Sequence, residues 1–202
     1  GVFANLAVTL GAKRLVLLSG RGEAGAQDAE ARLRQSGADV TIVRCSVFNQ
    51  NFSESFADAI RYGRLSMPVG DIQEPFVDAE DIADVAFAAL TDDRHIGEAY
   101  ELTGPRLLSL PQVVEELSHA MGRPVQYEAV SVPDYAKELI DHGFSPEESL
   151  PVAQLLADVL DGRNASLTDG VKRALDREPR DFAEFARAEV AAGTFDLPGG
   201  AS

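Results

Sequence analysis

The sequence predicts an α/β protein, and three observations carry that prediction. Residues 15–18 form a continuous apolar run, which is typical of a parallel strand buried on both faces of a sheet. A helical pattern over residues 27–35 follows and is closed by Gly37, and residues 40–43 form a second apolar run. A strand, a helix and a strand in this order make a βαβ unit. We therefore expect the two strands to pair in parallel.

The elements around this unit follow from similar patterns. Residues 2–10 are helix-like and lead directly into the first strand. Asp78 precedes an apolar stripe at helical spacing over residues 82–90, so we expect a helix with this carboxylate as its N-cap. Residues 100–103 are then predicted to form a short strand that ends before Gly104.

The last part of the chain is predicted to be mostly helical. Ser109 and Gln112 have the spacing of a capping box, which opens an amphipathic helix that ends at Gly122. Residues 125–130 are predicted to form a short strand, and helical patterns continue from Pro133 onward. One of these patterns is an apolar stripe formed by Val152, Leu155, Leu156 and Val159.

Together these elements predict the back half of a doubly wound, Rossmann-like parallel sheet with a mostly helical C-terminal lobe. We place the partial sheet region at residues 1–108 and the helical substrate or lid region at residues 109–202. The glycine-rich turn that leads from a strand into a helix and cradles a dinucleotide pyrophosphate is expected to be missing. Because the chain starts at Gly1 rather than at Met, we interpret it as an N-terminally truncated piece.

The composition restricts the classes of partner. The chain has 202 residues, and 45% of them are hydrophobic, which is enough for a core. Its formal net charge of −15 argues against nucleic acid, because phosphate contacts need clustered Lys and Arg. No apolar run approaches the roughly 20 residues that a membrane span requires. We therefore expect a cytoplasmic protein with neither a nucleic-acid nor a membrane partner.

The sequence shows no spacing typical of a metal site. Cys45 is the single cysteine, and His95, His119 and His142 lie far apart, each in a polar context that predicts exposure. Cys45 is expected to be a buried small hydrophobic residue, with a reactive thiol as the less favoured alternative.

Several blocks of the sequence resemble one family. They are residues 15–19, 37–44, 48–52, 76–83 and 100–105. In this order they resemble the NmrA-like family, a group of atypical short-chain dehydrogenases/reductases. Residues 168–171 and 179–182 are further similar to bacterial relatives of the ergot alkaloid biosynthesis reductases. The resemblance implies that the complete protein binds NAD(P) through a region that includes residues 1–108, and that it transfers hydride to a small electrophilic molecule.

Three departures limit what the resemblance implies for this chain. The strands that would carry the glycine-rich turn are expected to be missing, and Cys45 stands where the family usually has Pro. No tyrosine is followed four places later by Lys, so the general-acid pair of ordinary short-chain dehydrogenases is absent and the catalytic residues stay unassigned. Weak or absent NAD(P) binding is expected for this chain, and the choice between NAD and NADP stays open.

The candidate cofactor site lies at the carboxyl ends of the strands, where doubly wound sheets bind ligands. By the resemblance, the residues that flank the nicotinamide end of the cofactor are Ser19, Gly20, Cys45, Ser46, Val47 and Phe48. A capping or turn serine is an equal alternative for Ser19, and a pocket wall is favoured over a core position for Phe48. Arg44 ends an apolar strand, where an unpaired charge would be costly, so we expect it to pair with a carboxylate.

Substrate contacts are predicted at Asn51, Glu74 and Phe76. Asn51 either orients a substrate carbonyl or caps a helix that starts near Ser53. Glu74 and Phe76 lie where the sheet is expected to border the helical lobe.

Three functional hypotheses remain open at this point. The first is an NAD(P)H-dependent reductase, and the second is a non-catalytic family member that senses nucleotide and regulates a protein partner. The third is that this chain binds no nucleotide and persists by self-association across an open sheet edge. A homo-oligomer is expected because a strand that is apolar on both faces would otherwise expose one of its edges.

Overall fold

The computed structural model describes residues 2–197, which divide into two compact units. The described parts of unit 1 are residues 2–48, 75–106 and 166–181. Those of unit 2 are residues 49–74, 107–165 and 182–197. The two units are therefore interleaved along the chain, and the boundary proposed after residue 108 stays a prediction.

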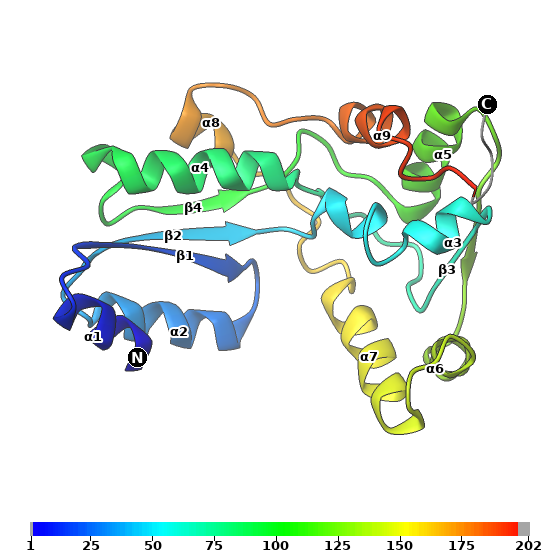
Figure 1. The fold of residues 1–202 in the computed structure, drawn as a ribbon, viewed down its shortest axis with the longest axis horizontal. Coiled ribbons are helices and arrows are strands. Elements are labelled where there is room, and N and C mark those ends of the chain that lie inside the picture. Colours follow the sequence, from blue (N-terminus) through cyan, green and yellow to red (C-terminus); the bar gives the residue numbers. More distant parts are fainter. Residues whose placement is uncertain (1, 198–202) are drawn as a thin grey trace. The chain divides into compact units, whose positions relative to one another are not determined.

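Unit 1 contains the expected βαβ arrangement. Its elements are α1 (Val2–Thr9), β1 (Arg14–Gly20), α2 (Ala24–Arg34), β2 (Asp39–Cys45), α4 (Ala79–Thr91), the 3₁₀ helix η2 (Asp93–His95), β4 (Ala99–Leu102) and α8 (Gly170–Leu175). The three strands form one parallel sheet in the order β1-β2-β4 (Figure 1). Leu15 pairs with Val40 and Leu18 with Val43, so the predicted parallel pairing is confirmed.

β1 lies at an edge of the sheet that residues 2–197 form. Within residues 2–197, β1 pairs with β2 alone, and the side chain of Leu18 is 53% exposed. The central strand is β2, in which Ile42 and Val43 are at most 1% exposed because strands flank it on both sides. The open edge expected for this apolar strand is thus present within the described residues.

Helices cover both faces of this sheet. α2 lies on one face and α4 on the other, while α8 packs against β4 and α4 (Figure 1). α4 begins where the sequence predicted, and the side chain of Asp78 caps it by accepting a hydrogen bond from the backbone N of Glu80 at 2.9 Å. On the α4 side, a core cluster joins side chains of β2, β4, α4 and α8, among them Val43, Val85 and Val171.

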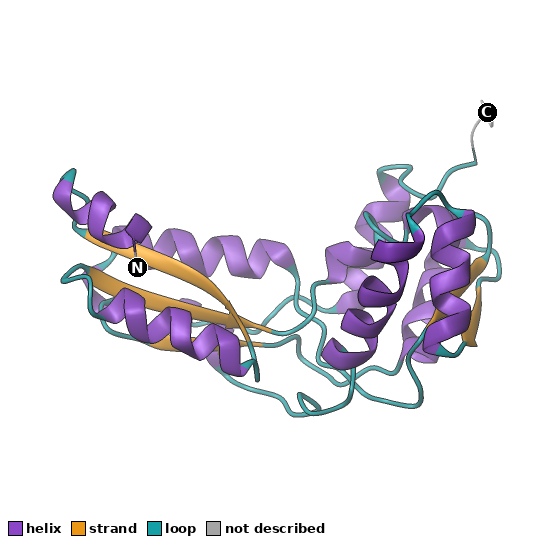
Figure 2. Cartoon of the chain, turned by 90° about the horizontal axis from the view of Figure 1, so that it is seen from below, coloured by secondary structure: helices purple, strands orange, loops and turns teal. Residues whose placement is uncertain are grey.

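Unit 2 is mostly helical (Figure 2). Its elements are η1 (Asn49–Phe52), α3 (Ala57–Arg61), β3 (Arg64–Met67), α5 (Leu110–Met121), β5 (Gln126–Ala129), α6 (Val132–Asp141), α7 (Pro146–Val159) and α9 (Phe182–Ala191). The capping box of Ser109 and Gln112 is present, and Gly122 ends α5 in the left-handed region at a φ of 66°. β3 and β5 pair in parallel, and β3 was not predicted.

The apolar stripe predicted on α7 is only partly buried, and Leu156 is the member that packs against α6. Leu155 is 60% exposed, whereas Ala153 is fully buried and packs with Tyr135 and Ala136 of α6. The pairing with α6 therefore selects the buried face, which an apolar count along α7 alone could not show. Throughout residues 2–197, no helix combines the length and the apolar character that a bilayer crossing needs.

Candidate functional site

The six residues predicted around the cofactor lie together at the carboxyl edge of the sheet in unit 1. Gly20 pairs with Cys45, and Cys45 pairs with Leu102, so the ends of β1, β2 and β4 are level. Backbone hydrogen bonds fix the two residues that follow β2, Ser46 and Val47. Ser46 donates from its N to the carbonyl of Leu102 at 3.1 Å, and the N of Val77 donates to the carbonyl of Val47 at 2.9 Å.

Ser19 anchors α2 instead of facing outward. Its hydroxyl donates to Oε1 of Glu30 at 2.8 Å, and both residues are buried. Because this hydrogen bond runs from within β1 to the middle of α2, Ser19 is neither a turn serine nor a helix cap. Its hydroxyl proton is committed to Glu30, which leaves the backbone as the means by which Ser19 could contact a ligand.

Arg44 forms the ion pair that was expected. Its Nε and one guanidinium NH2 donate to the two carboxylate oxygens of Glu30 at 2.9 and 2.7 Å, and its other terminal nitrogen donates to Glu101 at 3.1 Å. Two-point contacts of this kind are among the stronger hydrogen bonds in proteins. Hydrogen bonds from Arg44 lower the pKa of Glu30 although burial of the carboxyl opposes that change.

Arg21 was missed in the sequence and completes this network. It follows β1 directly, is 8% exposed, and donates from its backbone N to the carbonyl of Cys45 at 3.1 Å. Its guanidinium donates to Glu101 at 3.3 Å and to the hydroxyl of Ser166 at 2.7 Å. We call Ser19, Arg21, Glu30, Arg44, Glu101 and Ser166 the carboxyl-edge network. An arginine placed directly after an apolar strand was the signal that could have revealed it.

The hydroxyl of Ser46 lies at the same edge but differs from that of Ser19, because it has no hydrogen-bond partner in residues 2–197. The residue is 4% exposed, and no group in residues 2–197 forms a hydrogen bond with its Oγ. A buried hydroxyl without a partner costs about 1–3 kcal/mol of stability. Among the six predicted residues, Ser46 is therefore the one whose side chain is suited to bind a polar group of a ligand.

Cys45 is a packing residue, as expected. It is 7% exposed and belongs to the core cluster on the α4 side of the sheet. Burial raises the pKa of its thiol to about 12, so the thiol stays protonated at neutral pH and the reactive alternative is disfavoured. Cys45 reaches the edge through its backbone carbonyl, which accepts the N–H of Arg21.

The two phenylalanines near the edge are held in different ways. Phe48 is half-buried, forms an isolated parallel bridge with Val77, and packs against the core cluster. Phe76 is 3% exposed, and a Cβ built on Gly104 would lie 2.2 Å from the carbonyl oxygen of Phe76. Only glycine fits such a close approach of two backbones, so the exit of β4 is fixed against residue 76.

The glycine spacing of a dinucleotide-binding turn, which was expected to be missing, is present in the chain. Gly20, Gly22 and Gly25 have the spacing Gly-x-Gly-x-x-Gly, and the turn follows β1 and opens α2 inside a βαβ unit. Gly22 has a φ of 73°, a left-handed conformation that favours glycine. The signal was present in the sequence directly after residues 15–19.

The other parts of this turn do not match the roles known from pyrophosphate-binding turns. The third glycine of such a turn allows close packing of helix and strand, but a Cβ built on Gly25 would meet no atom within 4 Å. A Cβ built on Gly20 would lie 2.5 Å from Cδ of Glu23, so the carboxyl group of Glu23 rests against this glycine. A carboxylate at this position repels a phosphate.

Asn51 and Glu74 belong to unit 2. Asn51 lies inside η1, and α3 begins at Ala57 with Phe56 at its N-cap, so Asn51 does not cap a helix near residue 53. Its carbonyl accepts the N–H of Phe56 at 3.0 Å. Glu74 is fully buried and exchanges two backbone hydrogen bonds with Leu108, each 3.0 Å long. The substrate roles of both residues stay predictions.

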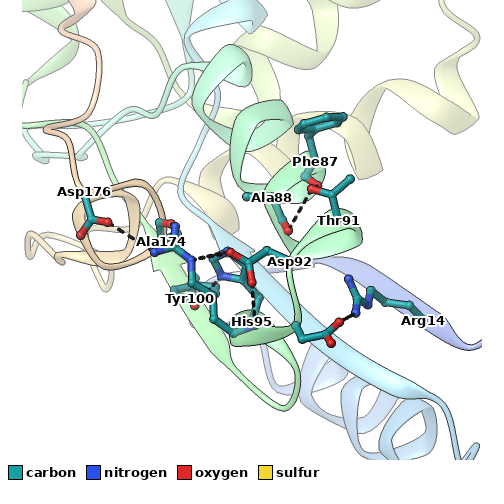
Figure 3. A network of polar contacts seen from close by, with 11 residues as sticks. Arg14, Phe87, Ala88, Thr91, Asp92, His95, Tyr100, Ala174 and Asp176 are labelled. Atoms are coloured by element: carbon teal, nitrogen blue, oxygen red, sulfur yellow. Dashed lines mark hydrogen bonds and ion pairs between the residues drawn. The ribbon is translucent and has the colours of Figure 1, made fainter.

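A second polar network lies at the amino edge of the sheet, and the sequence did not predict it (Figure 3). We call Arg14, Asp92, Asp93, Arg94, His95 and Tyr100 the amino-edge network. His95 was expected to be exposed but is 0% exposed, whereas His119 and His142 are exposed as expected. Residues 2–197 contain no cluster of three or more His, Cys, Asp or Glu that could hold a metal ion.

Comparison with known proteins agrees with the blocks found in the sequence. Residues 27–186 match the family model of the NmrA-like family. The chain is 37% identical over 198 residues to an NAD(P)H azoreductase from Xenophilus azovorans, which covers 92% of this chain and 68% of that protein. It is 32% identical over 192 residues to an agroclavine dehydrogenase from Claviceps fusiformis, with 91% and 66% covered.

The fold is also similar to that of a solved structure. An NADPH-dependent quinone oxidoreductase, QOR2 from Escherichia coli, complexed with NADPH, has a TM-score of 0.79 and 22% identity, with 93% of this chain and 69% of that chain covered. At this identity the likeness shows the fold alone. The family match and the two relatives carry the assignment: the chain belongs to the NmrA-like family, an NAD(P)-dependent oxidoreductase family with a Rossmann-type fold.

Proposed function

We propose that this chain forms part of an NAD(P)H-dependent reductase that transfers hydride to a small electrophilic molecule. The observation that carries this proposal is the 37% identity to the NAD(P)H azoreductase along 92% of the chain. The matched region spans 68% of that protein, so we propose that these residues contribute to the activity and not that they perform it alone.

The carboxyl edge of unit 1 fits the nicotinamide end of such a cofactor better than its phosphate end. Ser46 offers a buried hydroxyl without a partner in residues 2–197, while the carboxylate of Glu23 opposes an anion at the glycine-rich turn. The proposed contacts are the backbone of Ser19, Gly20, Cys45 and Val47, the hydroxyl of Ser46 and the ring of Phe48. When bound, the nicotinamide would supply the hydride.

The substrate contacts remain part of the proposal. Asn51 is half-buried and is the best placed of the three to meet a small molecule, because Glu74 and Phe76 are 0% and 3% exposed. The identity of the electrophile, and the choice between NADH and NADPH, are left open by this proposal.

We further propose that the chain alone binds NAD(P)H weakly, in the millimolar range or beyond. Charge-assisted hydrogen bonds to phosphate contribute about 1.5–3 kcal/mol each, and Glu23 disfavours them at the turn of residues 20–25. Titration of the chain with NADPH, followed by nicotinamide fluorescence, tests this expectation. Micromolar binding would overturn the weak-binding proposal without overturning the assignment of the nicotinamide end.

The nicotinamide assignment is tested by NMR with reduced nicotinamide mononucleotide as the probe. At millimolar probe concentration we expect amide shifts at Ser46, Val47 and Phe48, and a loss of affinity in Ser46→Ala. Inorganic pyrophosphate serves as the second probe. Shifts of Gly22 and Gly25 with pyrophosphate, and none at Ser46 with the mononucleotide, would contradict the proposed site.

A homo-oligomer is proposed on the basis of β1. Residues 2–197 provide it with one neighbouring strand, and Leu18 is 53% exposed beside this open edge. Unpaired strand edges with exposed apolar side chains favour association. Analytical ultracentrifugation should find dimers or larger species, and a stable monomer that unfolds cooperatively would contradict this proposal.

A further inference from the structure

His95 is fully buried between α4 and β4, and each of its polar groups is hydrogen bonded (Figure 3). Its Nδ1 lies 2.8 Å from the hydroxyl oxygen of Tyr100, and its Nε2 lies 3.2 Å from Nε of Arg94. Its carbonyl accepts the hydroxyl of Thr41 of β2 at 2.7 Å. The ring is therefore fixed by contacts to its own loop and to β4.

The contact with Arg94 determines the protonation state of the ring. A guanidinium group can only donate hydrogen bonds, so Nε2 must be the acceptor and carry no proton. The remaining proton lies on Nδ1, which donates to the hydroxyl oxygen of Tyr100. The neutral ring with its proton on Nδ1 is thus the form that satisfies both contacts.

Arg94 also holds the C-terminal end of α8. One terminal guanidinium nitrogen donates to the carbonyl of Ala174 at 2.9 Å, and the other pairs with Asp176 at 3.3 Å. A cation at the last carbonyls of a helix stabilises that helix end. The guanidinium of Arg173, also on α8, lies 5.2 Å from the centre of the Tyr100 ring. Both ring partners of His95 therefore contact α8.

Charged and titratable groups face His95 from four parts of unit 1. They are Asp92, Asp93, Arg94 and Glu98 around η2, Arg14 from β1, Tyr100 from β4, and Arg173 and Asp176 from α8. Burial has the largest effect and lowers the pKa of His95, with Arg94 and Arg14 acting in the same direction and Asp92 and Glu98 against it.

We propose that His95 is an acid-sensitive switch that controls how firmly α8 is held against β4. Addition of a proton to Nε2 removes the acceptor for Arg94 and places two cations side by side. Arg94 then has to leave the ring, and its contacts with Ala174 and Asp176 are lost with it. This inference does not depend on the proposed reductase activity.

The release of α8 would also loosen contacts at the carboxyl edge of unit 1. α8 begins at Gly170, where a Cβ would lie 2.0 Å from the carbonyl oxygen of Glu101. Just before it, Thr168 donates to the same carbonyl at 2.5 Å, and Ser166 accepts a hydrogen bond from Arg21. Residues 166–170 thus connect α8 to the carboxyl-edge network.

The test is an NMR titration of the chain from pH 8 to pH 5, with amide hydrogen exchange measured at each pH. We expect His95 to carry its proton on Nδ1 at pH 8 and to titrate below the ordinary histidine pKa of 6.5. At the same midpoint, protection factors of residues 171–176 should fall about tenfold, which corresponds to about 1.4 kcal/mol of opening free energy.

Two variants separate the switch from general acid unfolding. Gln at position 95 can accept from Arg94 but cannot be protonated, so His95→Gln should abolish the step in protection of α8. Should this variant not fold, Arg94→Met provides the second test, because loss of the neighbouring cation should raise the titration midpoint of His95. Unchanged protection of α8 across the midpoint, a step that persists in His95→Gln, or an unchanged midpoint in Arg94→Met would overturn the proposal.

Discussion

The two edges of the sheet in unit 1 carry polar networks of similar composition that differ in completeness. At the amino edge, both nitrogens of the His95 ring have partners, and Arg94 bonds to the ring and to α8. At the carboxyl edge, Glu30 is equally well satisfied, but the hydroxyl of Ser46 has no partner in the described chain. Within the described residues, the polar groups at the amino edge are thus satisfied by the fold, whereas the hydroxyl of Ser46 at the carboxyl edge is not.

The largest effect is expected from removal of the carboxylate at the centre of the carboxyl-edge network. Glu30→Ala removes two of the hydrogen bonds of the Arg44 guanidinium, which keeps its contact with Glu101, and the acceptor of the Ser19 hydroxyl. Breaking one half of a buried ion pair costs about 3 kcal/mol. Urea unfolding should therefore show a clear loss of stability, and Asp28→Ala on the exposed side of α2 is the matched control. Equal stability of the two variants would mean that the network contributes little.

The two edges should lose stability in different pH windows. The folded protein lowers the pKa of His95 below its ordinary 6.5, so its neutral form stabilises the fold above that pH and this contribution declines as the pH falls below it. Glu30 has a lowered pKa as well, so its contribution is present above 4.5 and is lost at lower pH. Each pKa unit corresponds to about 1.4 kcal/mol.

Unfolding free energies measured at pH 7.5, 5.5 and 3.5 check this order. His95→Gln should reduce the loss between pH 7.5 and 5.5, and Glu30→Gln should reduce the loss between pH 5.5 and 3.5. A first step that is the same in His95→Gln as in the parent chain would show that other groups dominate that window.

The smallest effects concern the two serines at the carboxyl edge, and they should have opposite signs. Ser19→Ala removes a donor to Glu30 and should lower the free energy of unfolding by about 1 kcal/mol. Ser46→Ala removes a buried hydroxyl without a partner and should leave stability unchanged or raise it by up to about 1 kcal/mol. Thermal unfolding of the pair measures both. A loss in Ser46→Ala as large as in Ser19→Ala would show that Ser46 has a structural partner.

Local patterns predicted the elements of this fold well. The caps at Asp78 and Ser109 and the strand at residues 40–43 depend on neighbours in sequence, and all three are confirmed. β3 was missed although Leu65 and Met67 are buried as in other strands. Its partner β5 lies far along the chain, so the pairing that makes it a strand is not a local signal.

The sequence could predict that the candidate site residues meet at one edge of the sheet, but not which partners their side chains have. Parallel strands end at one edge, so residues after β1 and β2 had to meet there. The sequence could not show that Ser19 is bound by Glu30 and that Ser46 is not, because both are small polar residues at similar places. His95 was placed wrongly since its polar neighbours in sequence, Asp92 and Arg94, turn out to bond within a network that covers the ring.

The interleaved arrangement of unit 1 has a consequence for synthesis on the ribosome. Nascent chains emerge at about 5–20 residues per second, N-terminal segments first. The strands of unit 1 are complete at residue 102, but Val171 and Ala174 of α8 close the core cluster around Leu102. Until these residues emerge, the growing chain exposes that apolar surface. Nascent chains stalled between residues 106 and 166 should therefore be the ones that chaperones bind most strongly.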